Sequence, residues 1–190
     1  MASANLTKKA FANSLKRLMK EKPLNKISVT ELVTMNGVNR QTFYYHFHDL
    51  YELVEWIYIH EALERIEDYK SYDTWQEGFL RIFKYIESNK SFCYNTLNSL
   101  GRNHLDYFIF SATRKLLMDV LIEVSPQYCV DDEALNFTAD YYTHAFTGLV
   151  IQWMHHGMKE RPERIIEHLS TIMEGNFRKA LESFESKQSL

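Results

Sequence analysis

Polar side chains of the types that read nucleic acid follow one another between residues 40 and 46. Arg40 suits the O6 and N7 acceptors of guanine, and Gln41 suits the N6 and N7 atoms of adenine. Thr42 can approach the methyl group of thymine. Two tyrosines and a histidine complete a segment that predicts a recognition helix, whose N-terminal half enters the major groove of DNA. The predicted exposed set is Arg40, Gln41, Thr42, Tyr44, Tyr45 and His46.

The residues before this segment predict a second helix that would position it. Ser28 followed by Glu31 has the spacing of a capping box, which satisfies backbone N–H groups at a helix start. Gly37 suits the left-handed turn that ends such a helix, and Asn39 suits the cap of the next one. The spacing therefore predicts a helix-turn-helix over residues 28–48. Ser28 and Thr30 lie where the first of the two helices begins, so we expect them to contact phosphate oxygens.

The sequence TFYYHF at residues 42–47, preceded by Gly37-Val38 and followed by an acidic and apolar run, resembles the TetR family of bacterial transcription regulators. The resemblance to the N-terminal domain of that family extends from about Leu6 to about Ile59. The aromatic-rich remainder is more loosely similar to the branch that contains the activator of dihydroxyacetone kinase operons. The resemblance implies an all-α fold, in which an N-terminal three-helix helix-turn-helix domain precedes a C-terminal helical domain for ligand binding and dimerisation.

The resemblance also implies roles for individual side chains. Tyr44 and His46 correspond to phosphate contacts, and Tyr45 corresponds to a residue near base edges or the backbone. Many members of the family have a lysine at the position of Leu50, and that lysine contacts phosphate. Leu50 cannot make this contact, which leaves His48 as the neighbouring side chain that could replace it.

Charge is divided unequally along the chain. Residues 1–48 hold eight lysines and arginines against two glutamates, a net charge of +6, whereas the remaining 142 residues carry −9. A basic end on an acidic body is typical of a DNA reader with a separate second domain. The lysines could instead form an ordinary solvated helix face. A protein-interaction adaptor without operator binding is therefore the competing class, although it leaves Arg40, Gln41 and Thr42 unexplained.

Length and composition fit one or two globular domains. The chain has 190 residues, of which 45% are hydrophobic and 25% charged. Helical periodicity recurs without sustained alternation, which predicts an all-α fold of about nine helices. We expect a DNA-binding domain at residues 1–48, a connecting helix at about 49–70, and a regulatory and dimerisation domain at 71–190. The last helix is predicted to begin at Pro162 and end at about Phe184.

The sequence also favours a protein of the cytoplasm that needs no cofactor. It lacks an apolar stretch of about 20 residues and the apolar core of a signal peptide, so we expect no membrane span. Cys93 and Cys129 suggest a reducing interior. They share no metal-type spacing, and no histidine pair lies at i, i+4, so we expect no metal site. The chain has no Gly-x-Ser-x-Gly, no glycine-rich phosphate loop and no Glu-x-x-His pair, so we expect no enzyme.

A single helix-turn-helix reads only a few base pairs, which predicts a homodimer on an inverted-repeat operator in double-stranded DNA. The resemblance places the dimer contact on the last two helices. The candidate residues are Ile165, Ile166, Leu169, Ile172, Met173 and Phe177 on the last helix and Ala145, Gly148 and Leu149 on the one before it. The same stripes could fill the core of one protomer, and we expect them to do both.

Aromatic residues make up 14% of the chain, and many lie in the predicted regulatory domain. They can line an apolar pocket between helices, or they can simply fill the core. We expect an unidentified small-molecule effector or partner protein to bind this domain and change the angle between the two DNA-reading heads. Repression relieved by an effector is the default expectation, and activation controlled by a partner protein is the alternative.

Overall fold

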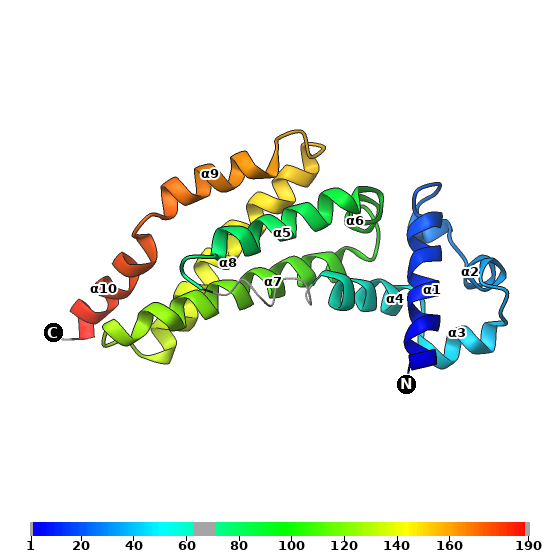
Figure 1. The fold of residues 1–190 in the computed structure, drawn as a ribbon, viewed down its shortest axis with the longest axis horizontal. Helices are drawn as coiled ribbons and strands as arrows, with labels where there is room; N and C mark the ends of the chain where they lie inside the picture. The colour runs from blue at the N-terminus through cyan, green and yellow to red at the C-terminus, as the bar shows by residue number, and fades with distance from the viewer. Residues whose placement is uncertain (1, 63–70, 189–190) are drawn as a thin grey trace. The chain divides into compact units, whose positions relative to one another are not determined.

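The computed structural model describes residues 2–62 and 71–188, and every regular element in these ranges is a helix (Figure 1). This confirms the predicted all-α fold. The α-helices are α1 (Ala2–Leu18), α2 (Val29–Met35), α3 (Arg40–His46), α4 (Leu50–Ile57), α5 (Trp75–Ser88), α6 (Lys90–Leu97), α7 (Arg102–Val124), α8 (Asp132–His155), α9 (Pro162–Met173) and α10 (Asn176–Gln188). Short helical turns are η1 (Leu24–Lys26), η2 (Tyr58–Ala62) and η4 (Ser125–Gln127). None of the described helices is long and apolar enough to cross a bilayer.

The chain divides into two compact units. The first contains residues Met1–Leu63 and Ser88–Phe108, and the second contains Glu64–Glu87 and Ile109–Leu190. Helix α6 and the first turns of α7 therefore lie with the N-terminal helices, although they are far from them in the sequence.

Helix α1 supplies the base on which the two short helices of the first unit pack. Its apolar stripe contains Phe11 and Leu15, which are both fully buried. The ring of Phe11 meets that of Phe43 edge to face, with 5.4 Å between the centroids. Leu32 from α2 is buried in the same core. One hydrophobic cluster thus fixes α2 and α3, which are too short to be stable alone.

The first unit is completed by residues that follow the helix-turn-helix. Tyr58 is buried and stacks on Phe108 of α7, with 4.9 Å between centroids and an angle of 8° between the rings. Phe92 of α6 lies 5.0 Å from the same tyrosine ring. The connecting helix predicted at about 49–70 is an α-helix from Leu50 to Ile57 and a π-helical turn from Tyr58 to Ala62. Its remainder lies outside the described residues.

An aromatic core holds the second unit together. Phe79 of α5 contacts Phe146 of α8 at 4.6 Å, and Phe83 contacts Trp153 at 5.0 Å between centroids. The indole N–H of Trp153 donates to the carbonyl of Glu160 at 2.8 Å, so the polar atom of this ring is satisfied. These four aromatics therefore fill the core.

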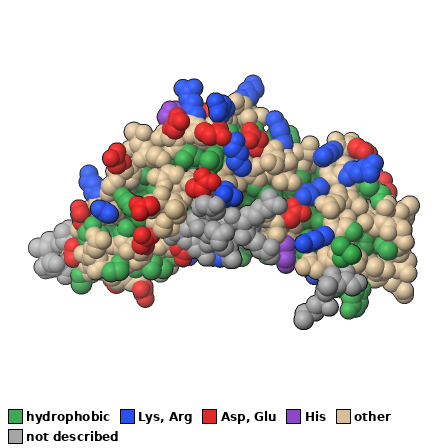
Figure 2. Space-filling model, in the orientation of Figure 1, with side chains coloured by type: hydrophobic (Ala, Val, Ile, Leu, Met, Phe, Trp, Pro, Cys, Tyr) green, Lys and Arg blue, Asp and Glu red, His purple; other side chains and the backbone are tan. Residues whose placement is uncertain are grey.

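The C-terminal helix differs from the prediction. The expected helix from Pro162 to about Phe184 is two helices, α9 and α10, because Gly175 has a φ of 70° and ends the first of them. Side chains of both charges alternate over α9 (Figure 2). Glu163 of this helix pairs with Lys84 of α5 at 2.6 Å, which raises the pKa of Lys84 and lowers that of Glu163.

Candidate nucleic-acid interface

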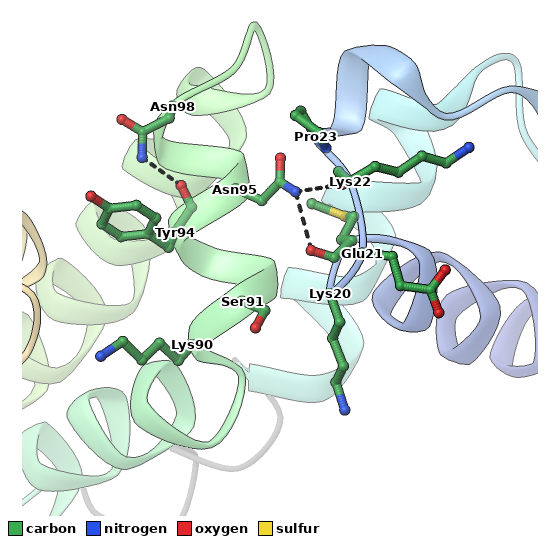
Figure 3. A pocket seen from close by; sticks show the side chains of 10 residues that line it. Lys20, Glu21, Lys22, Pro23, Lys90, Ser91, Tyr94, Asn95 and Asn98 are labelled. Carbon is green, nitrogen blue, oxygen red and sulfur yellow. Dashed lines mark hydrogen bonds between the residues drawn. The ribbon is translucent and has the colours of Figure 1, made fainter.

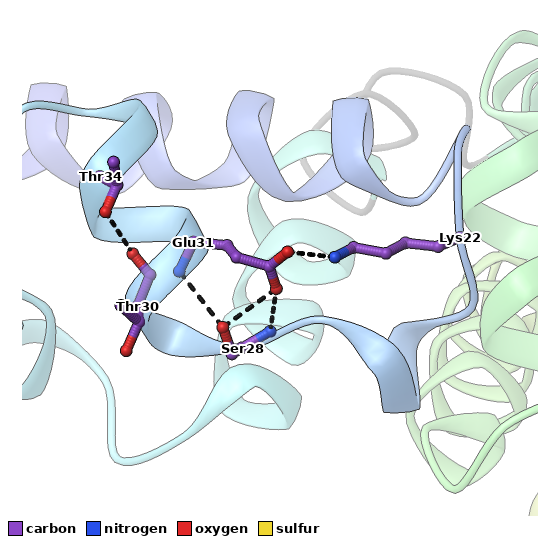
Figure 4. A network of polar contacts seen from close by, with 5 residues as sticks. All are labelled: Lys22, Ser28, Thr30, Glu31 and Thr34. Atoms are coloured by element: carbon purple, nitrogen blue, oxygen red, sulfur yellow. Dashed lines mark hydrogen bonds and ion pairs between the residues drawn. The ribbon is translucent and has the colours of Figure 1, made fainter.

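A network of polar contacts fixes the start of α2 (Figure 4). The backbone N–H of Glu31 donates to the Ser28 hydroxyl at 3.3 Å, and the Glu31 carboxylate accepts from the Ser28 N–H at 2.9 Å. This is the predicted capping box. The Ser28 hydroxyl also donates to Glu31 at 3.0 Å, so its hydrogen is already used within the protein. Thr30 is exposed beside it.

Lys22 forms an ion pair with the same Glu31 carboxylate. This hydrogen-bonded ammonium, with the Ser28 N–H and hydroxyl, lowers the pKa of Glu31 to about 2. The carboxylate is therefore charged at neutral pH, and it ties the segment before η1 to the first turn of α2.

The turn between α2 and α3 has the conformation that its glycine permits. Gly37 has a φ of 62°, and the N–H of Val38 donates to the carbonyl of Val33 at 3.1 Å. Asn36, just before it, donates to the Ser14 hydroxyl of α1 at 3.0 Å. The turn is thus anchored to α1.

Asn39 caps α3, as its position predicts. Its side-chain oxygen accepts from the Thr42 N–H at 2.9 Å and from the Thr42 hydroxyl at 3.1 Å. The N–H and the hydroxyl of Thr42 are therefore both used in the cap. Only the methyl group of Thr42 remains available to contact a base. Phe43, fully buried, fastens the helix to the core.

The outer face of α3 carries the side chains suited to DNA. Arg40 and Gln41 are exposed at its start, and Tyr44 and Tyr45 are 49% and 83% exposed. The Arg40 guanidinium donates to the Tyr44 hydroxyl at 3.2 Å. The Tyr45 ring meets the His46 ring edge to face at 4.9 Å. The structure thus brings the predicted base-reading residues onto one short exposed helix.

His46 lies at the boundary between this face and α1. Burial, and then the nearby charge of Lys8, lower the pKa of the His46 imidazole. A neutral ring at physiological pH can donate a hydrogen bond to a phosphate but adds no positive charge. The cation beside it is Lys8, whose ammonium lies 5.3 Å from the ring centroid of Phe47.

Lys8 is a candidate phosphate ligand that does not belong to the predicted set of DNA-contacting residues. The available signal was its place one turn before Phe11, whose ring packs on Phe43 of α3. At the start of α4, in contrast, Asp49 accepts from the N–H groups of Tyr51 and Glu52 at 2.8 and 2.9 Å. The half-buried Leu50 follows this acidic cap, so this chain has no cation at the position where the family resemblance implies a lysine.

The residues predicted for a dimer differ in burial, and Ile165 is half-buried. Four of them, Ile166, Leu169, Met173 and Phe177, are buried within the second unit. Ile172 is 65% exposed, and Ala145, Gly148 and Leu149 lie on an exposed face of α8. Phe137 and Tyr141, which were not predicted, extend that face and are 65% and 63% exposed.

Each of the two units carries an open pocket. One, of about 530 Å³, lies in the first unit between the end of α1 and α6 and is drawn in Figure 3. The other, of about 400 Å³, lies in the second unit between the start of α5 and the end of α9. Trp75, Tyr72 and Met173 line it with the polar side chains of Asp73, Gln76, Ser170, Thr171 and Glu174. In the described part of the chain, no three histidine, cysteine or acidic side chains come together as metal ligands would.

Comparison with known proteins assigns the chain to a family. Residues 73–175, more than half of the chain, match the TetR family described as "Transcriptional regulator C-terminal region". Over 109 residues the chain is 30% identical to the HTH-type dhaKLM operon transcriptional activator DhaS of Lactococcus lactis. That alignment covers 57% of this chain and 58% of the relative, so the match spans little more than half of either protein. A solved structure of the dihydroxyacetone kinase operon activator DhaS has the same fold, with a TM-score of 0.72 at 23% identity over 94% of this chain and 98% of that one. The chain belongs to the TetR family of transcriptional regulators.

Proposed function

We propose that this protein binds a specific operator through the exposed face of α3. The observation that carries the proposal is the joint exposure of Arg40, Gln41, Tyr44 and Tyr45 on a helix that Phe43 anchors in the core. Arg40 and Gln41 would read base edges, and the Thr42 methyl group would contact thymine. Tyr45 would lie near the base edges or the DNA backbone.

Contacts to phosphate would set the register of the helix-turn-helix on DNA. We assign them to Thr30, Tyr44 and His46, with Lys8 as the cation. Ser28 and Asn39 serve this interface through their caps, which hold the N-terminal N–H groups of α2 and α3 in place.

We also propose that the protein acts as a homodimer in the cytoplasm. The exposed face of α8, with Ile172 of α9, offers an apolar surface that a second copy could cover. Two heads would then read half-sites separated by about 34–36 Å or a multiple of that distance.

For the sign of regulation we propose activation. The sequence expectation was repression, but the relative from Lactococcus lactis is named an activator, and that name favours the other sign. A small effector or a partner protein, received by the second unit, would control it. A reporter gene behind the operator distinguishes the two signs, because deletion of an activator lowers expression and deletion of a repressor raises it.

DNA binding itself is tested by fluorescence anisotropy with the DNA upstream of the neighbouring genes, at two salt concentrations. A DNA reader loses affinity steeply as salt rises, because binding releases counterions. The Arg40→Ala/Gln41→Ala variant should lose its preference for this DNA over random sequence. Binding equal to that of random DNA would instead support the adaptor.

A further inference from the structure

One amide side chain connects α6 to the segment between α1 and η1 (Figure 3). The Asn95 side-chain nitrogen donates to the carbonyl of Met19 at 3.2 Å and to that of Lys22 at 2.9 Å. Its side-chain oxygen accepts from the Leu24 N–H at 2.9 Å. All three partners are backbone atoms, so Asn95 fixes the path of the chain whatever side chains this segment carries.

The segment held by Asn95 leads directly to the helix-turn-helix. Lys22, whose carbonyl Asn95 binds, pairs through its ammonium with Glu31. Glu31 in turn closes the capping box with Ser28 at the start of α2 (Figure 4). A continuous series of polar contacts therefore runs from α6 through Lys22 to the first turn of α2.

We propose that Asn95 is a positioning residue for DNA reading, which acts through Lys22 and Glu31 on the N-terminal end of α2. The inference rests on the proposed DNA-binding function and names how that site is held in its binding geometry. A shift of α6 would move the Lys22 backbone, change the Lys22–Glu31 pair and alter the exposed first turn of α2. The affinity for DNA would change although no DNA-contacting residue has been replaced.

The chain offers a matched control on the same helix. Asn98 lines the same cavity, but its side chain donates at 2.8 Å to the carbonyl of Tyr94 within α6. Asn98→Ala removes an equivalent amide without touching the segment after α1. Asn95→Ala removes three bonds to that segment, and Asn95→Asp keeps the acceptor for the Leu24 N–H while losing both donors.

The first measurement uses the free protein and needs no DNA. The pKa of Glu31, followed by NMR of its side-chain carboxyl carbon, should rise in Asn95→Ala and in Asn95→Asp because Lys22 is no longer held against it. The Glu31 pKa should stay unchanged in Asn98→Ala. Lys22→Met removes the ammonium altogether and so gives the largest rise in the Glu31 pKa that loss of this ion pair can cause. An unchanged Glu31 pKa in both Asn95 variants would overturn the inference.

The second measurement is a double-mutant cycle on operator affinity. Asn95→Ala should weaken operator binding about tenfold when it is the only substitution. It should weaken operator binding less than about twofold when Lys22→Met is already present. Equal losses in both backgrounds would show that Asn95 does not act through Lys22. If the wild type itself fails to prefer an operator, the proposed function fails. If the wild type binds and the Asn95 variants bind equally well, only this inference fails.

Discussion

Arg40 and Tyr44 lie one turn apart on α3, and the arginine Nη2 donates to the tyrosine hydroxyl at 3.2 Å. The guanidinium carbon is 5.8 Å from the centroid of the same ring. A long arginine held in this way loses less rotamer freedom when it binds than one that moves freely in solvent. The pair therefore preorganises the side chain best suited to guanine.

Arg40→Ala should weaken binding to the operator by about 1–3 kcal/mol and should affect random DNA much less. The reason is that a bidentate contact to guanine is lost, whereas most phosphate contacts remain. Anisotropy titrations with operator and scrambled duplexes measure the two losses. Arg164→Ala, on an exposed part of α9, is the control. Equal losses on both duplexes would assign Arg40 to phosphate instead.

Gly37→Ala should lower the free energy of unfolding by about 1–2 kcal/mol, measured by urea denaturation. Nothing lies within 4 Å of a β-carbon built at this position, so the cost comes from the φ of 62° and not from a clash. Gly37→Asn should cost less, because asparagine tolerates the left-handed region. Similar losses in both variants would point to crowding at the turn.

Leu149→Asp should abolish the proposed dimer, because it places a charge on the apolar face of α8. Ile122→Asp, on an exposed part of α7 in the same unit, should leave the dimer intact. Light scattering after size-exclusion chromatography reports the mass of each variant. A Leu149→Asp protein that stays dimeric would place the interface elsewhere.

Glu31 predicts a dependence of stability on pH. Its pKa is lowered from 4.5 to about 2 in the folded protein, so the folded state binds its proton less readily than the unfolded state. The contribution of this carboxylate is complete above about pH 4.5 and is lost as the pH falls towards 2. The stability difference between wild type and Glu31→Gln should therefore be larger at pH 7 than at pH 3. Glu21→Gln is the control, and a difference independent of pH would contradict the prediction.

The two cysteines should differ in reactivity. Cys93 is fully buried, and burial raises the pKa of its thiol to about 12, whereas Cys129 is exposed. A disulfide reagent should modify one thiol rapidly in the folded protein and both after denaturation. Cys129→Ser should abolish the rapid reaction. Rapid modification that survives in this variant would indicate that the core around Cys93 opens.

The local signals in the sequence were sufficient for the helix-turn-helix. Capping residues such as Ser28 and Asn39 act through bonds to neighbours three positions away, so their pattern is visible in the sequence. Phe43 and Phe47 are both buried, and their separation of one helical turn is likewise visible in the sequence.

The features that the sequence did not predict have different causes, and one of them is contact between distant segments. Asn95 is an unremarkable polar residue until the fold places it against the carbonyls of Met19 and Lys22. The break at Gly175 was missed because apolar spacing continues through it from Met173 to Phe177. The predicted dimer surface on α8 lacked Phe137 and Tyr141, because a hydrophobic pattern assigns aromatic residues to the core although both side chains are exposed.

The bonds from Asn95 to the carbonyls of Met19 and Lys22 limit how DNA specificity can be transferred between regulators. A chimera that exchanges residues 1–48 alone would place a foreign backbone segment against Asn95 of the original α6. The transferable module is discontinuous and comprises residues 1–63 together with 88–108. Hybrid regulators built on this chain should exchange both segments at once, so that each head keeps the helices that complete its core.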